Sequence, residues 1–454
     1  MRSDPAATRR RLSEARAVMA EGATPTFSAR ARSSVATALV VGVVASAGAA
    51  FAHAFRSAVE AGTGLLAGPG EDLVTRQRVS AWAIFGIVTL GLLVAAAIGQ
   101  WALRWRGERL GLTAVAAAAR GEGVGPSLVG TLLRATGTLA ATSGLASLGR
   151  ETPILETGGS IGTFVGRITR RSPAMLAVAG IAAGFAAAYH APIAAVLYVE
   201  EHLGVRRDRR AITHAVAGAA LGYVVLREVF GGEPIFPAAA HPAGGSIVVL
   251  AAVGLVPAMV ASRLFLLARE RWPKAVDGTT IAARRWAHRV AFAVIGGAIV
   301  ALVPLTAGNG MAALRHASTN TTIEIAVGLC LAKLIATSAA VAAGAPGGVF
   351  SPSLAVAAGA ALLGFVALSH LGVPLPGTYW DGMLVAMTIG IAVGIRSPLV
   401  ATIVVAEMTG DLRLLPVSAA TVLVATVLDR ALDRRRAGAG AGEPVAVTLH
   451  DEDA

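Results

Sequence analysis

Long apolar segments recur along the whole chain, and they decide what it can fold into. Residues 35–55 and 82–103 have the length of about 20 residues that crosses a bilayer as an α-helix. Other segments, such as 383–395, are too short for a full crossing. Half-spanning helices persist at membrane depth only where protein surrounds them. The pattern therefore predicts an all-α membrane protein built from tilted and partly spanning helices.

The composition points the same way. Of the 454 residues, 55% are hydrophobic and only 15% are charged, whereas soluble domains average about 25% charged residues. The 53 glycines suit membrane helices that pack closely through small side chains. Cys330 is the only cysteine, so a disulfide framework and a cysteine metal site are excluded. We expect no cofactor and no metal.

The net charge of +12 raises the alternative of a nucleic-acid-binding protein. The arginines gather at the chain ends and at the edges of apolar segments, not in a stripe with aromatic residues, so we reject nucleic acid as a partner. The positive-inside rule explains them better. It predicts a multi-pass protein of the plasma (inner) membrane with both termini in the cytoplasm.

The chain divides into a basic cytosolic segment (1–32), a membrane domain (33–431) and a short cytosolic tail (432–454). Within the membrane domain an internal repeat is visible: Pro192 and Pro398 each start an apolar stretch, with Glu201 and Glu407 nine residues later. Proline suits the first turn of a helix. The repeats run over about 33–228 and 246–431, and duplicated halves are typical of transporters whose substrate sites lie between them.

The first motif that carries chemistry is the run Gly-Arg-Glu-Thr-Pro at 149–153. Charges between apolar segments are costly and usually functional. Pro153 predicts a helix start there, whose positive end attracts anions. The carboxylate of Glu151 can occupy such an anion position, and protonation would release it. The alternative is a structural pair of Arg150 with Glu151 at a helix cap.

The second motif is the run Gly-Gly-Val-Phe-Ser-Pro at 347–352. Pro352 again marks the first turn of a helix. We expect the backbone N–H groups near Gly348, Val349 and Phe350 to be left unpaired by that helix and to face an anion. The Phe350 ring would shield the site from water. The alternative is an ordinary glycine-rich bend before a membrane helix.

The two motifs, in this order, resemble the CLC family of chloride channels and chloride/proton antiporters. Residues 149–153 are similar to the family's GREGP motif, with Thr152 in place of the second glycine, and residues 347–352 match GGxFxP. Residues 190–201, 308–310 and 397–409 also resemble CLC segments. The resemblance implies that the protein is a homodimer surrounded by membrane lipid and that each subunit has two inverted repeats. It also makes Glu151 the gating and proton-carrying residue, with Gly149, Arg150, Thr152, Gly348, Val349 and Phe350 around the anion.

The sequence departs from the family pattern at the anion site and on the proton route. Leu110 stands where the family has a coordinating serine, and Ala446 where it has a coordinating tyrosine. Each lost hydroxyl would weaken the central site by ~1 to 3 kcal/mol. The position of the internal proton-accepting glutamate is His202, which can titrate near neutral pH. His202 or Glu201 is therefore the possible internal acceptor; the alternative is a solvated helix end.

We predict a CLC-type transporter that exchanges chloride for protons. The alternative is a passive CLC-type chloride channel, because the internal proton acceptor and the two hydroxyl ligands differ from the family pattern. A membrane-embedded enzyme or a scaffold is the remaining alternative. The sequence contains no HExxH or P-loop pattern, and we do not expect an enzyme.

Overall fold

The computed structural model describes residues 27–68, 79–105, 110–205 and 208–439. Most of the predicted cytosolic segment 1–32, much of the predicted tail 432–454 and Ala446 lie outside these ranges. The described residues form helices and no strand, so the predicted all-α fold is confirmed. Among them, eight helices are long and apolar enough to cross a membrane, and several shorter apolar helices accompany them.

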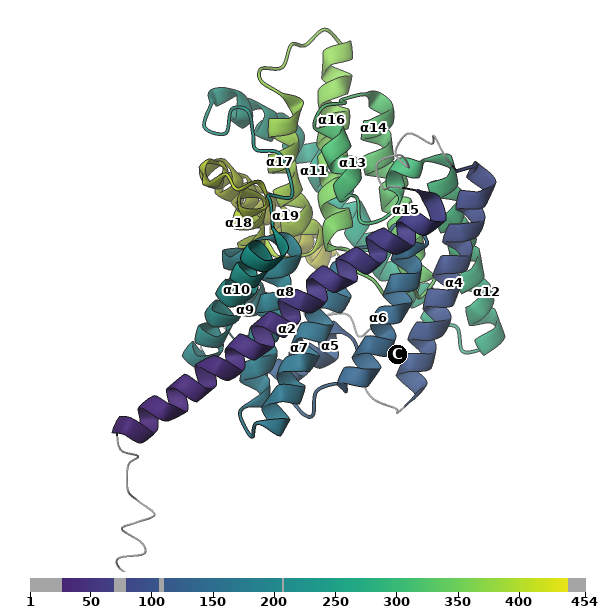
Figure 1. Cartoon of the computed structure of the whole chain (residues 1–454). Helices are drawn as coiled ribbons and strands as arrows, with labels where there is room; N and C mark the ends of the chain where they lie inside the picture. Colours follow the sequence, from purple (N-terminus) through teal and green to yellow (C-terminus); the bar gives the residue numbers. More distant parts are fainter. Residues whose placement is uncertain (1–26, 69–78, 106–109, 206–207, 440–454) are drawn as a thin grey trace, which may run out of the picture.

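The helices of the first half come before residue 231. They are α2 (Phe27–Ala67), α4 (Ala81–Trp105), α5 (Leu112–Ala119), α6 (Leu128–Ser143), α7 (Glu151–Ile168), α8 (Pro173–Tyr189), α9 (Pro192–His202) and α10 (Arg209–Phe230). In Figure 1, α2 runs obliquely across the molecule, and it contacts α6, α7, α8 and α10.

The helices of the second half begin at Gly245. They are α11 (Gly245–Asp277), α12 (Ala282–Leu302), α13 (Met311–Ala317), α14 (Ile323–Val327), α15 (Lys333–Ala342), α16 (Phe350–His370), α17 (Tyr379–Ile389), α18 (Pro398–Thr409) and α19 (Leu415–Ala439). A π-helical turn, Gly328–Ala332, joins α14 to α15, and another, Gly390–Gly394, extends α17. Short 3₁₀ turns lie at Pro304–Thr306 and Leu412–Leu414.

Glycines allow α7 and α8 to pack backbone against backbone. A Cβ atom on Gly158 would lie 2.3 Å from the carbonyl oxygen of Gly180, and a Cβ atom on Gly162 would lie 2.0 Å from that of Leu176. No larger side chain fits at either position. Because lipid gives no hydrophobic drive for helix association, such close approach supplies the dispersion contacts that hold membrane helices together.

The repeated proline and glutamate pattern has a structural explanation in α9 and α18. Both carboxylate oxygens of Glu407, near the end of α18, accept from the N–H groups of Ile193 (2.9 Å) and Ala194 (2.8 Å) in the first turn of α9. Conversely, Glu201 in α9 accepts from Leu399 (3.0 Å) and Val400 (3.3 Å) in α18. Each helix thus caps the start of the other, which requires that the two run antiparallel.

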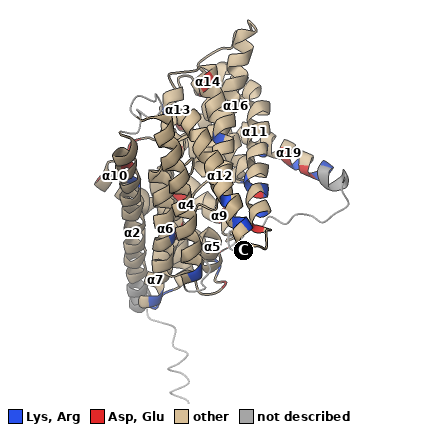
Figure 2. Cartoon of the chain, turned by 90° about the vertical axis from the view of Figure 1, so that its right-hand side faces the viewer, with Lys and Arg blue, Asp and Glu red and all other residues tan. Residues whose placement is uncertain are grey.

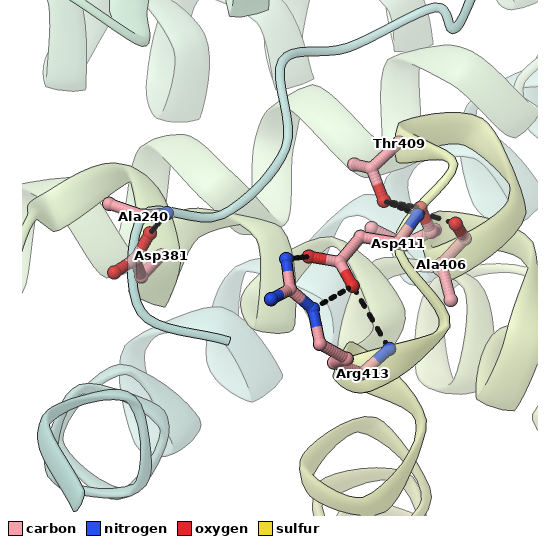
Figure 3. Close-up of polar contacts among 7 residues, drawn as sticks. Ala240, Asp381, Ala406, Thr409, Asp411 and Arg413 are labelled. Carbon is pink, nitrogen blue, oxygen red and sulfur yellow. Dashed lines mark hydrogen bonds and ion pairs between the residues drawn. The ribbon is translucent and has the colours of Figure 1, made fainter. Parts of the chain in front are cut away.

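The connection between the halves, residues 231–244, is fastened to the second half. Asp381, fully buried in the first turn of α17, accepts from the backbone N–H groups of Ala240 (2.8 Å) and His241 (3.1 Å). Figure 3 shows this contact beside the turn after α18, where Asp411 accepts from the Arg413 side chain through both oxygens. The Asp381 carboxylate therefore satisfies backbone groups that would otherwise lack a partner.

We expect Asp381→Asn to lower the free energy of unfolding by ~1 to 3 kcal/mol, because an amide NH₂ group would face a backbone N–H donor. Thermal unfolding of the purified protein in detergent measures the change. Glu122→Gln is the matched control, because Glu122 pairs with Arg120 at the surface, where ion pairs contribute little. Equal melting temperatures for Asp381→Asn and the wild type would contradict this role.

Candidate functional site

The two sequence motifs meet through their backbones. The N–H group of Gly149 donates to the carbonyl of Gly348 at 2.6 Å, and that of Gly348 donates to the carbonyl of Gly149 at 2.7 Å. This pair forms an isolated antiparallel bridge. The expectation that the Gly348 N–H group is unpaired is therefore wrong, because Gly149 uses it. The starts of α7 and α16 are held side by side by this bridge.

Glu151 is the first residue of α7, and it is 5% exposed. Its Oε1 atom accepts from Asn309 Nδ2 at 3.0 Å and from the hydroxyl of Ser351. Its Oε2 atom is buried and has no hydrogen-bond partner among the described residues. The carboxylate thus lies between the two halves and is largely buried.

Position 149 requires glycine because the Glu151 carboxylate lies too close to leave room for a side chain. A Cβ atom there would lie 2.2 Å from Glu151 Oε2 and 2.8 Å from the carbonyl oxygen of Gly348. At Gly348 a Cβ atom would be 3.1 Å from both Glu151 Oε2 and the hydroxyl of Thr152. The bridge therefore forms a side-chain-free floor beneath the carboxylate.

Phe350 begins α16, after Val349 at the N-cap position, and Pro352 lies in its first turn. No side chain caps this end of the helix. The first turn of a helix presents unpaired N–H groups and the positive end of the dipole. The Phe350 ring is 8% exposed and packs on Tyr189, with 4.6 Å between ring centroids. An anion at this helix start would be shielded from water on that side.

Arg150 does not pair with Glu151. Its guanidinium donates to Glu60 on α2, with 3.0 Å from Nη1 to Oε1. A structural Arg150–Glu151 pair, the alternative considered for this motif, is thus not what the structure shows. The Glu151 carboxylate instead accepts from two neutral donors, Asn309 and Ser351.

A buried lysine holds the turn that carries Asn309. The ammonium group of Lys333 donates to the carbonyls of Thr306 (2.9 Å) and Gly308 (2.5 Å). These residues begin the turn from which Asn309 reaches Glu151. Lys333 also interacts electrostatically with the Glu151 carboxylate. Sequence reasoning noticed the 308–310 turn but missed its contact with Glu151, because 158 residues separate the two positions.

Two adjoining cavities lie beside the start of α7. They have volumes of about 560 and 420 Å³, and both are lined by Arg150, Asn309 and Arg315. The smaller one also reaches Arg56 and Glu151 itself. Carboxylates line them as well, Glu60 in both cavities and Glu233 in the smaller one. Among the described residues no group of three His, Cys, Asp or Glu side chains is placed to hold a metal ion.

On the other side of the site, His202 and Glu201 lie at the end of α9. Glu201 uses both oxygens as the cap of α18. His202 is half-buried, contacts the hydroxyl of Ser397 through Nε2, and stacks on Tyr198 with 4.4 Å between ring centroids. The two candidate proton acceptors therefore differ in their partners. Glu201 accepts from backbone N–H groups of α18, whereas the Nε2 atom of His202 contacts a neutral hydroxyl.

Comparison with known proteins decides the family. The model of the voltage gated chloride channel family matches residues 90–430, most of the chain. The chain belongs to this family, the CLC proteins. The resemblance read from the two motifs is thus confirmed.

Individual CLC relatives carry two kinds of name. A putative chloride channel protein ClcB-like of Ralstonia nicotianae is 29% identical over 82% of this chain and 88% of its own. The voltage-gated ClC-type chloride channel ClcB of Salmonella typhimurium is 30% identical, over 68% of this chain and 74% of its own. The H(+)/Cl(-) exchange transporter ClcA of Cronobacter sakazakii is 29% identical over 62% of each chain.

Solved CLC structures have the same fold. A slow cyanobacterial Cl⁻/H⁺ antiporter superposes with a TM-score of 0.72 at 22% identity, covering 87% of this chain and 94% of its own. A CLC-type fluoride/proton antiporter gives 0.69 at 17% identity, with coverage of 90% and 98%. The predicted CLC-type fold is therefore confirmed.

Two residues at the predicted anion site, Leu110 and Ala446, depart from the CLC pattern, and the structure describes only the first of them. Leu110 is 1% exposed and offers no hydroxyl, while Ala446 lies outside the described residues. Beside Leu110, a Cβ atom on Gly111 would be 3.8 Å from the guanidinium carbon of Arg134. Arg134 forms a buried ion pair with Glu156, at 3.3 Å. Sequence reasoning missed this pair, whose partners meet only when α6 packs on α7.

We expect Gly149→Ala to destabilise the protein by ~1 to 3 kcal/mol, because the added Cβ atom overlaps both Glu151 Oε2 and the Gly348 carbonyl. Unfolding in detergent measures this loss. Gly86→Ala in α4 is the control: a Cβ atom there meets nothing within 4 Å, and alanine favours the helix by about 1 kcal/mol. An equally stable Gly149→Ala variant would contradict the close approach.

Proposed function

We propose that this CLC protein exchanges chloride, or a similar small anion, for protons across the membrane, and that Glu151 serves both ions. The observation that carries the proposal is the position of its carboxylate: buried, at the starts of α7 and α16, with Oε2 lacking a hydrogen-bond partner among the described residues. Helix starts favour anions. A carboxylate there competes with a halide, and its protonation releases the position.

The anion then lies against the start of α16, where Val349 and Phe350 supply backbone N–H groups and the Phe350 ring excludes water. Gly149 and Gly348 keep the floor of the site free of side chains, while Thr152 turns its hydroxyl toward Gly348. Arg150 and Arg315 line the cavities through which the anion approaches. Neutral donors and helix dipoles bind a halide without trapping it, which suits transport.

The proposed internal proton acceptor is His202 rather than Glu201. Both oxygens of Glu201 accept from backbone N–H groups of α18, so protonating it would break a helix cap. His202 is half-buried, which leaves it in reach of water, and its contact with Ser397 suits either protonation state.

A passive chloride channel is the second candidate, because the relative ClcB of Salmonella typhimurium carries a channel name. In a channel, Glu151 would gate the anion path and no proton would be driven uphill. The distinction is thermodynamic: a chloride gradient moves protons against their own gradient only in an exchanger.

The placement in the membrane follows from charge. Figure 2 shows Lys and Arg mostly toward the end of the molecule at which α2 begins. By the positive-inside rule, this end faces the cytoplasm, with both termini on that side. The cavities beside Glu151 then open on the opposite side. We also propose that the protein works as a homodimer in the plasma membrane, as other CLC proteins do.

We expect Glu151→Gln to reduce chloride-driven proton transport at least about 100-fold while chloride flux continues, because the amide cannot take up and release a proton. Glu151→Ala should leave the anion path constantly open. Paired chloride and proton fluxes from liposomes give both quantities. Glu122→Gln, at a carboxylate that pairs with Arg120 at the surface, is the matched control with normal coupling. Proton transport that persists in Glu151→Gln would refute the gate.

We expect His202→Ala to lower the number of protons moved per chloride at least about tenfold, because the internal acceptor is lost. The same liposome assay measures it. His214→Ala is the control, since His214 bonds to the Arg210 carbonyl of its own helix turn. An unchanged ratio in His202→Ala, with a reduced ratio in Glu201→Gln, would transfer the role to Glu201.

A further inference from the structure

Tyr189 presents a buried hydroxyl that the site described so far does not use. It is the last residue of α8 and is 1% exposed. Its Oη atom is buried and has no hydrogen-bond partner among the described residues. Leaving a buried hydroxyl without a partner is destabilising, and phenylalanine would fill the same space without that penalty. The hydroxyl therefore calls for a functional explanation.

The surroundings of this hydroxyl include the gate. Tyr189 interacts electrostatically with the Glu151 carboxylate and lies beside the hydroxyl of Ser351, which itself donates to Glu151 Oε1. The Tyr189 ring packs on Phe350, at the start of α16. Glu151 Oε2 is likewise without a partner among the described residues. A hydroxyl donor and a carboxylate acceptor thus belong to neighbouring side chains, and both side chains lie beside the Ser351 hydroxyl.

A continuous line of aromatic contacts leads from Tyr189 to His202. Tyr189 packs on Phe185 with 4.7 Å between ring centroids, Phe185 packs on Tyr198 at 4.8 Å, and Tyr198 stacks on His202 at 4.4 Å. The two tyrosines also interact electrostatically with each other. This line spans from the half-buried end of α9 to the gate, and it carries hydroxyl groups on two of its rings.

We propose that Tyr189 is the last proton donor to Glu151, on a route that enters at His202 and passes Tyr198. The inference rests on the proposed exchange function and adds a route to it. A proton arriving from the His202 side binds a lone pair of Tyr189 Oη. The O–H bond already present then breaks, and its proton bonds to Glu151 Oε2. Tyr189 ends unchanged, and Glu151 ends neutral and released from the anion position.

The chain offers a complete set of controls, because it contains four tyrosines. Tyr189→Phe and Tyr198→Phe remove hydroxyls from the line and keep both rings. Tyr223→Phe and Tyr379→Phe remove hydroxyls from α10 and α17, away from it. Each variant of the full chain is reconstituted in liposomes. Chloride efflux and the proton influx that it drives are then recorded from the same vesicles.

We expect Tyr189→Phe to reduce protons moved per chloride at least about tenfold, with chloride flux retained within about twofold. Tyr198→Phe should reduce the same ratio by a smaller factor, and the two control variants should keep it. Retained chloride flux shows that each variant is folded. An unchanged ratio in Tyr189→Phe overturns the relay; if chloride flux or halide preference changes instead, the hydroxyl binds the anion.

The outcome also separates this inference from the function on which it rests. A wild-type protein that moves chloride without protons refutes both the exchange and the relay. A wild-type protein that couples the two ions, together with a Tyr189→Phe variant that couples them equally well, refutes only the relay.

Discussion

The structure depends on a pair of backbone hydrogen bonds between Gly149 and Gly348. These bonds join two loops that are far apart in sequence, and they align the starts of α7 and α16. Two helix starts side by side concentrate positive potential at one point inside an apolar protein. The proposed anion site and the Glu151 carboxylate both lie where these two helix starts meet. The bridge also explains the glycines, because a side chain at position 149 would occupy the space of the Glu151 carboxylate.

Glu151, the proposed gate, accepts hydrogen bonds from side chains that carry no charge. Asn309 and Ser351 donate to one oxygen of Glu151, and the adjacent residue Arg150 is paired with Glu60. A guanidinium bonded directly to the carboxylate would strongly favour its ionised form. Lys333 acts at one remove, since its hydrogen bonds go to the carbonyls of the turn that carries Asn309. This arrangement suits a group that must be charged and neutral in turn.

Structural features that depend on a short stretch of sequence could be predicted from the sequence alone. The apolar segments predicted a helical membrane fold, and the 149–153 motif predicted Glu151 at a helix start, where the structure has it. Features that need two distant segments could not. Asn309 and Ser351, the hydrogen-bond donors to Glu151, are distant from it in sequence. The Gly348 N–H group likewise donates to the carbonyl of the distant Gly149. The nine-residue spacing of proline and glutamate was visible, but its meaning required α9 and α18 to be seen antiparallel.

The exchanged glutamates of α9 and α18 have a consequence for biosynthesis. The first-turn amides of α9 receive their acceptor from Glu407, more than 200 residues later in the chain. Until the ribosome has made that residue, the N-terminal half inserts with polar backbone groups that lipid cannot satisfy. Neither half is thus a finished unit by itself. The nascent protein must keep its early helices shielded, by the insertion machinery or by one another, until the last segments arrive.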